Sequence, residues 1–164
     1  MKIGLLGVSN RFRISANPKW EFTLDQKRWF SERAKGETLH LCCGYTHFDF
    51  AVNVDIDPEA SLDIQADMFH LPFKPGVFDT VICDPPFRLA IDKRPLWVRT
   101  LLYAIRKKRG SRILLKTDFI PYFGESWELK ELVIHQGARY WAPISLLLHY
   151  QLVDPTLTEF LTGI

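Results

Sequence analysis

The residues whose types and spacing most clearly suggest a chemical role form the run Asp84-Pro85-Pro86-Phe87. This run follows directly on Phe78 to Cys83, an apolar stretch that predicts a buried strand. The two prolines fix a rigid, non-helical turn, which holds an acidic side chain beside an aromatic ring. The turn suits a planar substrate with an NH2 group: the substrate ring stacks on Phe87, while Asp84 and the Pro85 carbonyl accept hydrogen bonds from the amine. An ordinary Pro-Pro loop is the alternative interpretation.

Three further segments carry glycine or acidic residues where a predicted strand ends. The apolar run from Thr38 to Cys43 ends at Gly44, and the period-two alternation from Ala51 to Asp57 contains Asp55. Asp67 lies in the short mixed segment from Ser61 to Phe69. Ligands of parallel sheets bind outside the carboxyl ends of the strands. We therefore expect these residues and Asp84 to form one constellation.

Each member of this constellation also has a purely structural interpretation. Gly44 is either a simple turn residue or a point of close backbone approach to a ligand. Asp55 is either an exposed acid at a strand end or a carboxylate that accepts both hydroxyls of a ribose. Asp67 either caps a short helix or accepts a hydrogen bond from an adenine amino group.

The elements that must position these residues alternate between strand and helix. Helices are predicted over Asp25 to Lys35 and over Pro95 to Arg109, the second capped by Gly110, and Ser111 to Lys116 is a further strand. Glu128 to His135 and Ile144 to Val153 predict an antiparallel pair at the sheet edge. This order predicts an α/β sandwich with a mostly parallel sheet.

The sequence resembles the class I S-adenosylmethionine-dependent methyltransferases. The resemblance is to the branch that carries an Asp/Asn-Pro-Pro-Tyr/Phe motif and methylates amino nitrogens. It runs from about Thr38 to Asp118. Its anchors are Leu39-His40-Leu41-Cys42-Cys43-Gly44, Val54-Asp55-Ile56-Asp57-Pro58, Ala66-Asp67-Met68-Phe69-His70-Leu71-Pro72-Phe73 and Phe78 to Phe87.

The resemblance implies a Rossmann-like three-layer sandwich, a seven-stranded sheet ending in the hairpin, and S-adenosylmethionine as cofactor, with no metal. By the same resemblance Cys42, Cys43 and Gly44 line the methionine end of the cofactor and Asp55 holds the ribose. Asp67 holds the adenine amino group, with Met68 or Phe69 against the ring. Leu41 and Ile56 complete the expected cofactor-binding set, and Asp84, Pro85, Pro86 and Phe87 hold the target amine.

The sequence departs from the family pattern at the first of these motifs. His40 stands where the family usually has an acid, and Cys42 and Thr46 stand where it usually has glycines. Seven residues separate Gly44 from Val52, too few for a full crossover helix. We therefore expect the first crossover helix to be shortened or missing. The departure also leaves open a catalytically degenerate relative that only binds nucleic acid or acts as a scaffold.

The charge of the chain is unevenly distributed. Between residues 36 and 87 nine acidic residues stand against one lysine, whereas between residues 88 and 112 nine basic residues stand against one aspartate. The basic stretch begins directly after the proline turn with Arg88, Lys93 and Arg94, which we expect to contact nucleic-acid phosphates. Its last cations could instead complement the dipole of the predicted helix. The resemblance implies methylation of an exocyclic base amine, with adenine N6 favoured; a small-molecule methyltransferase is the further alternative.

The composition is that of an ordinary globular protein. Of 164 residues, 47% are hydrophobic and 24% charged, which excludes disordered and fibrous classes. We expect a single domain over residues 1–164, in which residues 1–36 form an extension and helix packed on the core. Three cysteines cannot all pair, which indicates a reducing compartment, and we expect a cytoplasmic protein without membrane contact. Because the chain has no room for a separate recognition domain, a homodimer or a heteromeric specificity partner is also expected.

Overall fold

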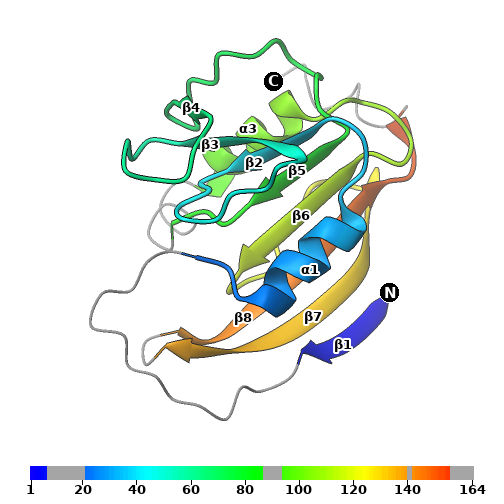
Figure 1. Cartoon of the computed structure of the whole chain (residues 1–164). Coiled ribbons are helices and arrows are strands. Elements are labelled where there is room, and N and C mark those ends of the chain that lie inside the picture. The colour runs from blue at the N-terminus through cyan, green and yellow to red at the C-terminus, as the bar shows by residue number, and fades with distance from the viewer. Residues whose placement is uncertain (7–20, 87–93, 140–141, 156–164) are drawn as a thin grey trace.

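The protein is built on one twisted sheet of eight strands with helices on its faces (Figure 1). The computed structural model describes residues 1–6, 21–86, 94–139 and 142–155; side chains at 5–6, 94–95, 136–139 and 142–144 lie outside the described set. The elements are β1 (Lys2–Leu6), α1 (Leu24–Arg33), β2 (Thr38–Leu41), β3 (Ala51–Asp55), β4 (Ile64–Gln65), β5 (Thr80–Cys83), α3 (Arg94–Ala104), β6 (Arg112–Thr117), β7 (Trp127–Arg139) and β8 (Ala142–Leu152).

The strand order is β1-β7-β8-β6-β5-β2-β3-β4. Strands β2 to β6 run parallel to one another, and β8 lies antiparallel between β6 and β7. The predicted α/β sandwich, its mostly parallel sheet and its antiparallel C-terminal hairpin are therefore confirmed. The expected seven strands are extended by an eighth, β1, which pairs in parallel with β7.

Helix α1 begins at a capping box that the sequence encodes. The Thr23 side chain accepts a hydrogen bond from the Gln26 backbone, and the Gln26 side chain accepts one from the Thr23 backbone. The helix buries Trp29 and Phe30 against one face of the sheet, with Ile82, Leu114, Val133 and Leu147. Its range agrees with the prediction of Asp25 to Lys35 to within two residues.

Helix α3 is shorter than predicted. It ends at Ala104, not at Arg109, so Gly110 does not cap it. Ile105 instead forms a parallel bridge with Phe78, and the Arg106 guanidinium donates to Asp79 Oδ1 and the Val77 carbonyl. Residues 105–106 therefore pair with the segment that precedes β5. The chain leaves the helical path at this point, although its apolar stripe predicts a longer helix.

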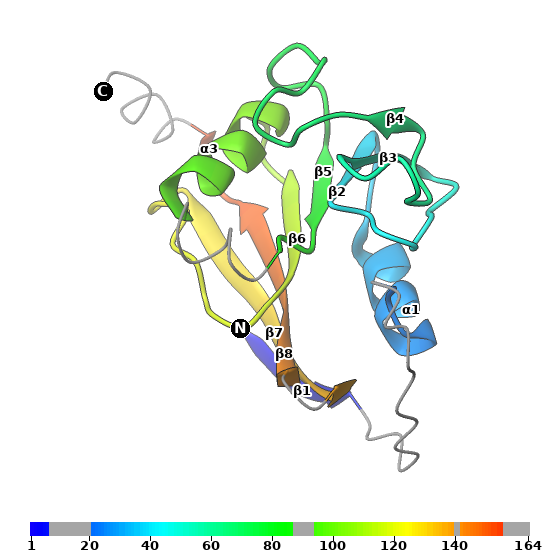
Figure 2. The ribbon, with the colours of Figure 1, turned by 90° about the vertical axis from the view of Figure 1, so that its left-hand side faces the viewer.

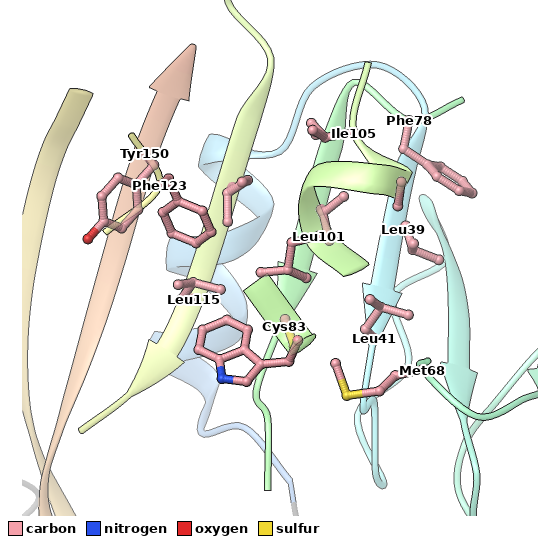
Figure 3. Packing of buried hydrophobic residues seen from close by; sticks show 14 of the residues in the cluster. Leu39, Leu41, Met68, Phe78, Cys83, Leu101, Ile105, Leu115, Phe123 and Tyr150 are labelled. Atoms are coloured by element: carbon pink, nitrogen blue, oxygen red, sulfur yellow. The ribbon is translucent and has the colours of Figure 1, made fainter. Parts of the chain in front are cut away.

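Helices α1 and α3 lie on opposite faces of the sheet (Figure 2). The α3 face holds the larger hydrophobic cluster, in which Trp97 and Leu101 are fully buried. Figure 3 shows Leu101 of α3 among the strand residues Leu39, Leu41 and Leu115. Burial of these apolar side chains fixes the sheet as a rigid platform, and the loops at its carboxyl edge project from it. No helix within the described part of the chain is long and apolar enough to span a membrane.

The first crossover helix is missing, as the short spacing predicts. Residues 42–50, all described, form turns between β2 and β3. The connection is therefore a compact loop that runs from the carboxyl end of β2 to the amino end of the parallel strand β3, and the polar groups inside it need partners other than those of a helix.

Candidate functional site at the carboxyl edge of the sheet

Gly44 and Asp55 meet where β2 and β3 end. The Gly44 backbone N–H donates to Asp55 Oδ2 at 2.8 Å, and the Asp57 N–H donates to Asp55 Oδ1 at 3.0 Å. Gly44 has a φ of 52°, in the left-handed region that glycine adopts without strain. Two backbone donors thus orient the carboxylate, which has about four acceptor positions in all. The Asp55 carboxylate can therefore accept further hydrogen bonds from a ligand.

A buried amide stabilises the loop that replaces the first crossover helix. The Asn53 side chain donates to the carbonyls of Phe48 and Ala51 and to Asp63, and its Oδ1 accepts from the Phe48 N–H. The Asn53 donors also hold the pKa of the Asp63 carboxyl below its usual value. One fully buried side chain thereby satisfies several polar groups of the loop.

His40, at the position where the methyltransferases that the sequence resembles usually have an acid, belongs to the same network. Its Nδ1 lies 3.1 Å from Asn53 Oδ1, and its ring packs against Phe22 and Phe48. Complete burial lowers the pKa of His40 to about 4. The residue is therefore a neutral core histidine, and it supplies no carboxylate to the site.

The cysteines of the first motif lie between the strand ends. Cys42 has a φ of 55°, where the family pattern has glycine, and its Sγ is 3.8 Å from Sδ of Met68. Burial, followed by the charge of Asp55, raises the pKa of Cys43 to about 12. Burial is also the main cause that raises the pKa of Cys83. The thiols of Cys43 and Cys83 are thus protonated at neutral pH and poor nucleophiles.

Asp67 begins a tight turn after β4. Its Oδ1 accepts from the Phe69 N–H at 3.0 Å, and its Oδ2 lies 3.2 Å from Nδ1 of His70. Asp67 thus caps a turn, and the short helix that its structural interpretation predicted is not formed. Met68 is buried in the core and Phe69 packs partly against it. Of the remaining predicted cofactor residues, Leu41 is fully buried and Ile56 is largely exposed.

Asp84 follows β5 directly and forms an ion pair that the sequence analysis did not anticipate. Its Oδ2 accepts from Nζ of Lys116, on the neighbouring strand β6, at 2.5 Å. Pro85 is buried and Pro86 exposed, so the turn leaves the sheet immediately. Phe87 lies outside the described residues. The sequence signal for this pair is Lys116, which directly follows the apolar run Ile113 to Leu115 of β6.

A groove of about 630 Å³ lies beside the strand ends, between the turn after β4 and helix α3. It is lined by Asp67, Met68, Phe69, His70, Leu71, Leu96, Arg99, Thr100 and Tyr103. Three predicted cofactor residues line it, whereas Gly44, Asp55 and Asp84 do not. The strand ends and their hydrogen bonds, more than this groove, therefore define the candidate site.

Some cations of the basic stretch bind other parts of the fold, whereas others have no described partner or lie outside the described residues. Arg106 pairs with Asp79, and the Arg112 guanidinium donates to the Arg33 carbonyl, so both stabilise the fold. Arg99 is exposed beside the groove. Arg88 and Lys93 lie outside the described residues, and of Arg94 only the backbone, at the start of α3, is described.

No protein-family model and no curated protein matches the sequence. Solved structures show clear similarity of fold. The N-methyltransferase NodS from Bradyrhizobium japonicum WM9 is 12% identical, with a TM-score of 0.59 over 79% of this chain and 92% of NodS. A SAM-dependent methyltransferase from Methanosarcina mazei is 12% identical, with a TM-score of 0.55 over 82% of this chain and 100% of the other.

A methyltransferase that acts on RNA has the same fold. The tRNA (uracil-54, C5)-methyltransferase of Pyrococcus abyssi, solved with S-adenosyl-L-homocysteine, is 19% identical, with a TM-score of 0.55. The match covers 79% of this chain and 38% of that protein. NodS has also been solved with S-adenosyl-L-homocysteine. The chain described here therefore has the Rossmann-like fold of these methyltransferases.

Proposed function

We propose that the protein is an S-adenosylmethionine-dependent methyltransferase that modifies an exocyclic amine of a nucleic-acid base, with adenine N6 favoured. The observation that carries the proposal is the meeting of Gly44 with Asp55, one strand away from Asp84, at the carboxyl edge of the sheet. The similar structures support the cofactor, because two of them hold S-adenosyl-L-homocysteine.

The residues present fit this cofactor. Gly44 allows close backbone approach, and Asp55 has acceptor capacity for the ribose hydroxyls. Cys42 and Cys43 would line the methionine end, and Asp67 with Met68 or Phe69 would hold the adenine. S-adenosylmethionine, when bound, supplies an electrophilic methyl group on a sulfonium.

Asp84 and the Pro85 carbonyl would accept hydrogen bonds from the target NH2 group, with the base stacked on Phe87. The amine nitrogen forms the new N–C bond with its lone pair, while the electrons of the broken C–S bond stay on sulfur, and the nitrogen releases one proton to water. Orientation of the amine and exclusion of water account for the rate, without a covalent enzyme intermediate. A base within a duplex would have to be flipped out.

The proposal of a nucleic-acid substrate is based on the basic stretch that follows the proline turn. Arg88, Lys93 and Arg94 would contact phosphates, and exposed Arg99 lies on the same helix as Arg94. Phosphate contacts make binding fall steeply with salt. A salt-sensitive affinity for oligonucleotides would therefore separate this proposal from a small-molecule methyltransferase.

Calorimetric titration with S-adenosylmethionine and S-adenosylhomocysteine tests the cofactor first. We expect micromolar binding, followed by N6-methyladenine in an oligonucleotide incubated with enzyme and cofactor, detected by mass spectrometry after digestion. Absence of binding at millimolar ligand, with and without oligonucleotide, would overturn the proposal. Oligonucleotide binding alone would then favour the degenerate scaffold, an alternative that the missing crossover helix supports.

A further inference from the structure

Lys116 reaches the candidate amine site from the strand next to Asp84. Its ammonium lies 2.5 Å from Asp84 Oδ2, and the two side chains are only 20% and 24% exposed. Partly buried charges at this distance interact more strongly than exposed ones, because less water screens them. Asp84, the acid of the proline turn, is thus held in an ion pair with Lys116.

The side chain of Lys116 is held beside Phe22, a residue that also contacts the loop between β2 and β3. Lys116 Nζ lies 5.2 Å from the centroid of Phe22, within the range of a cation–π contact. The Phe22 N–H in turn donates to Oγ1 of Thr46 at 2.7 Å, and its ring stacks on Phe30 of α1. Thr46, which replaces a family glycine, therefore helps to hold the ring beside Lys116.

The charge of Lys116 also affects the pKa of a neighbouring histidine, His135. Burial is the main cause that lowers the pKa of His135, and the Lys116 charge adds to it. His135 Nδ1 lies 3.1 Å from Nε2 of Gln26, which places a neutral polar pair on this side of the lysine. Lys116 and Asp84 thus bring opposite charges together at the carboxyl ends of β5 and β6.

We propose that Lys116 neutralises Asp84 and so restricts the amine site to uncharged amines, such as nucleobase or amide NH2 groups. The inference rests on the proposed function. A lone carboxylate would attract an alkylammonium ion more strongly than a neutral amine. With Lys116 on the same carboxylate, an incoming ammonium would meet a like charge a few ångströms away, which disfavours its binding. A neutral NH2 group still donates to the Asp84 carboxylate without this repulsion.

The test compares two amine probes within each variant. One probe is a single-adenine oligonucleotide, and the other is a lysine-containing dipeptide, which is cationic at neutral pH. Methyl transfer to each is measured as kcat/KM for wild type, Lys116→Met and Lys116→Arg. Lys130→Met is the matched control, because Lys130 also forms an ion pair, with Glu128, but on β7, which β8 separates from β6. Cofactor affinity and the melting temperature are recorded for every variant.

In Lys116→Met we expect the preference for the oligonucleotide over the dipeptide to fall by about tenfold or more, with cofactor affinity retained. Lys116→Arg should restore the preference and Lys130→Met should leave it unchanged. If Lys116→Met is unstable, Asp84→Asn provides a second route. That change removes the carboxylate that pairs with Lys116, so the double variant Asp84→Asn, Lys116→Met should be more active on the oligonucleotide than Asp84→Asn alone.

Two results would overturn the inference while leaving methyltransferase activity in place. One is an unchanged preference in Lys116→Met together with no recovery in the double variant. The other is a wild-type enzyme that prefers the dipeptide to the oligonucleotide. Failure of the wild type to methylate either probe, or to bind the cofactor, would instead count against the proposed function itself.

Discussion

The Gly44 N–H and the Asp55 carboxylate, 2.8 Å apart, join the ends of the two strands that flank the missing crossover helix. In parallel sheets a helix N-terminus usually delivers backbone donors to a ligand at this edge. Here one such donor comes from a loop, and it orients an acid on the next strand. The loop thus brings a backbone donor and a carboxylate together at this edge without the helix.

Asp55→Ala should weaken S-adenosylmethionine binding by roughly 1.5–3 kcal/mol, because a hydrogen bond to a charged group is lost. Calorimetry measures this directly. Asp57→Ala is the matched control, since Asp57 follows the same strand and its Oδ1 accepts only a local N–H, that of Glu59, among the contacts described. Equal affinities of the two variants would place the cofactor elsewhere.

Asn53→Leu should lower the free energy of unfolding by about 3 kcal/mol, because buried groups of the loop lose their partners. Urea unfolding measures the change. Gln65→Ala serves as control, since its exposed side chain donates one hydrogen bond, to the Ile56 carbonyl, and the expected loss is within about 0.5 kcal/mol. A loss in Asn53→Leu no larger than in the control would show that the loop is held by other contacts.

Asp84→Ala should abolish methyl transfer while S-adenosylmethionine affinity stays close to wild type, because Asp84 would contact the amine substrate and not the cofactor. Initial rates and calorimetry on the same preparations separate the two effects. Glu125→Ala, an exposed acid in the loop before β7, controls for a general change in charge. Full activity of Asp84→Ala would show that the proline turn does not hold the amine.

Local patterns predicted the central strands and the missing crossover helix correctly. Short apolar runs bounded by glycine or proline mark β2 and β5, and alternation marks β3. The seven residues between Gly44 and Val52 excluded a full crossover helix on length alone. The start of α1 was predicted to within one residue, whereas its capping box at Thr23 and Gln26 was recognised only in the structure.

Features that depend on distant contacts could not be predicted in this way. Strand β1 pairs with β7, more than 120 residues along the chain, and nothing in its own five residues indicates that partner. The end of α3 depends on the contact of Arg106 with Asp79. Likewise, the partner of Asp84 became apparent only when β5 and β6 were placed side by side, because Lys116 lies 32 positions away.

Stability should fall in mild acid because two buried histidines stay neutral in the folded protein. Burial lowers the pKa values of His40 and His149 to about 4, below the usual 6.5. Between these values the unfolded chain binds protons that the folded chain does not. The stabilisation of the folded state by these two neutral histidines is therefore complete above about pH 6.5, and it is lost as the pH falls towards 4.

Urea unfolding at about pH 7 and about pH 5 should show a loss of about 2 kcal/mol for each of the two histidines. His149→Leu should remove the part of this loss that His149 causes. Tyr150→Phe, on the same strand, is the control: burial raises the pKa of Tyr150 to about 12, so its phenol does not titrate in this range. An equal pH dependence in wild type and His149→Leu would falsify the assignment of this loss to His149, since a neutral buried imidazole must become charged on unfolding below its ordinary pKa.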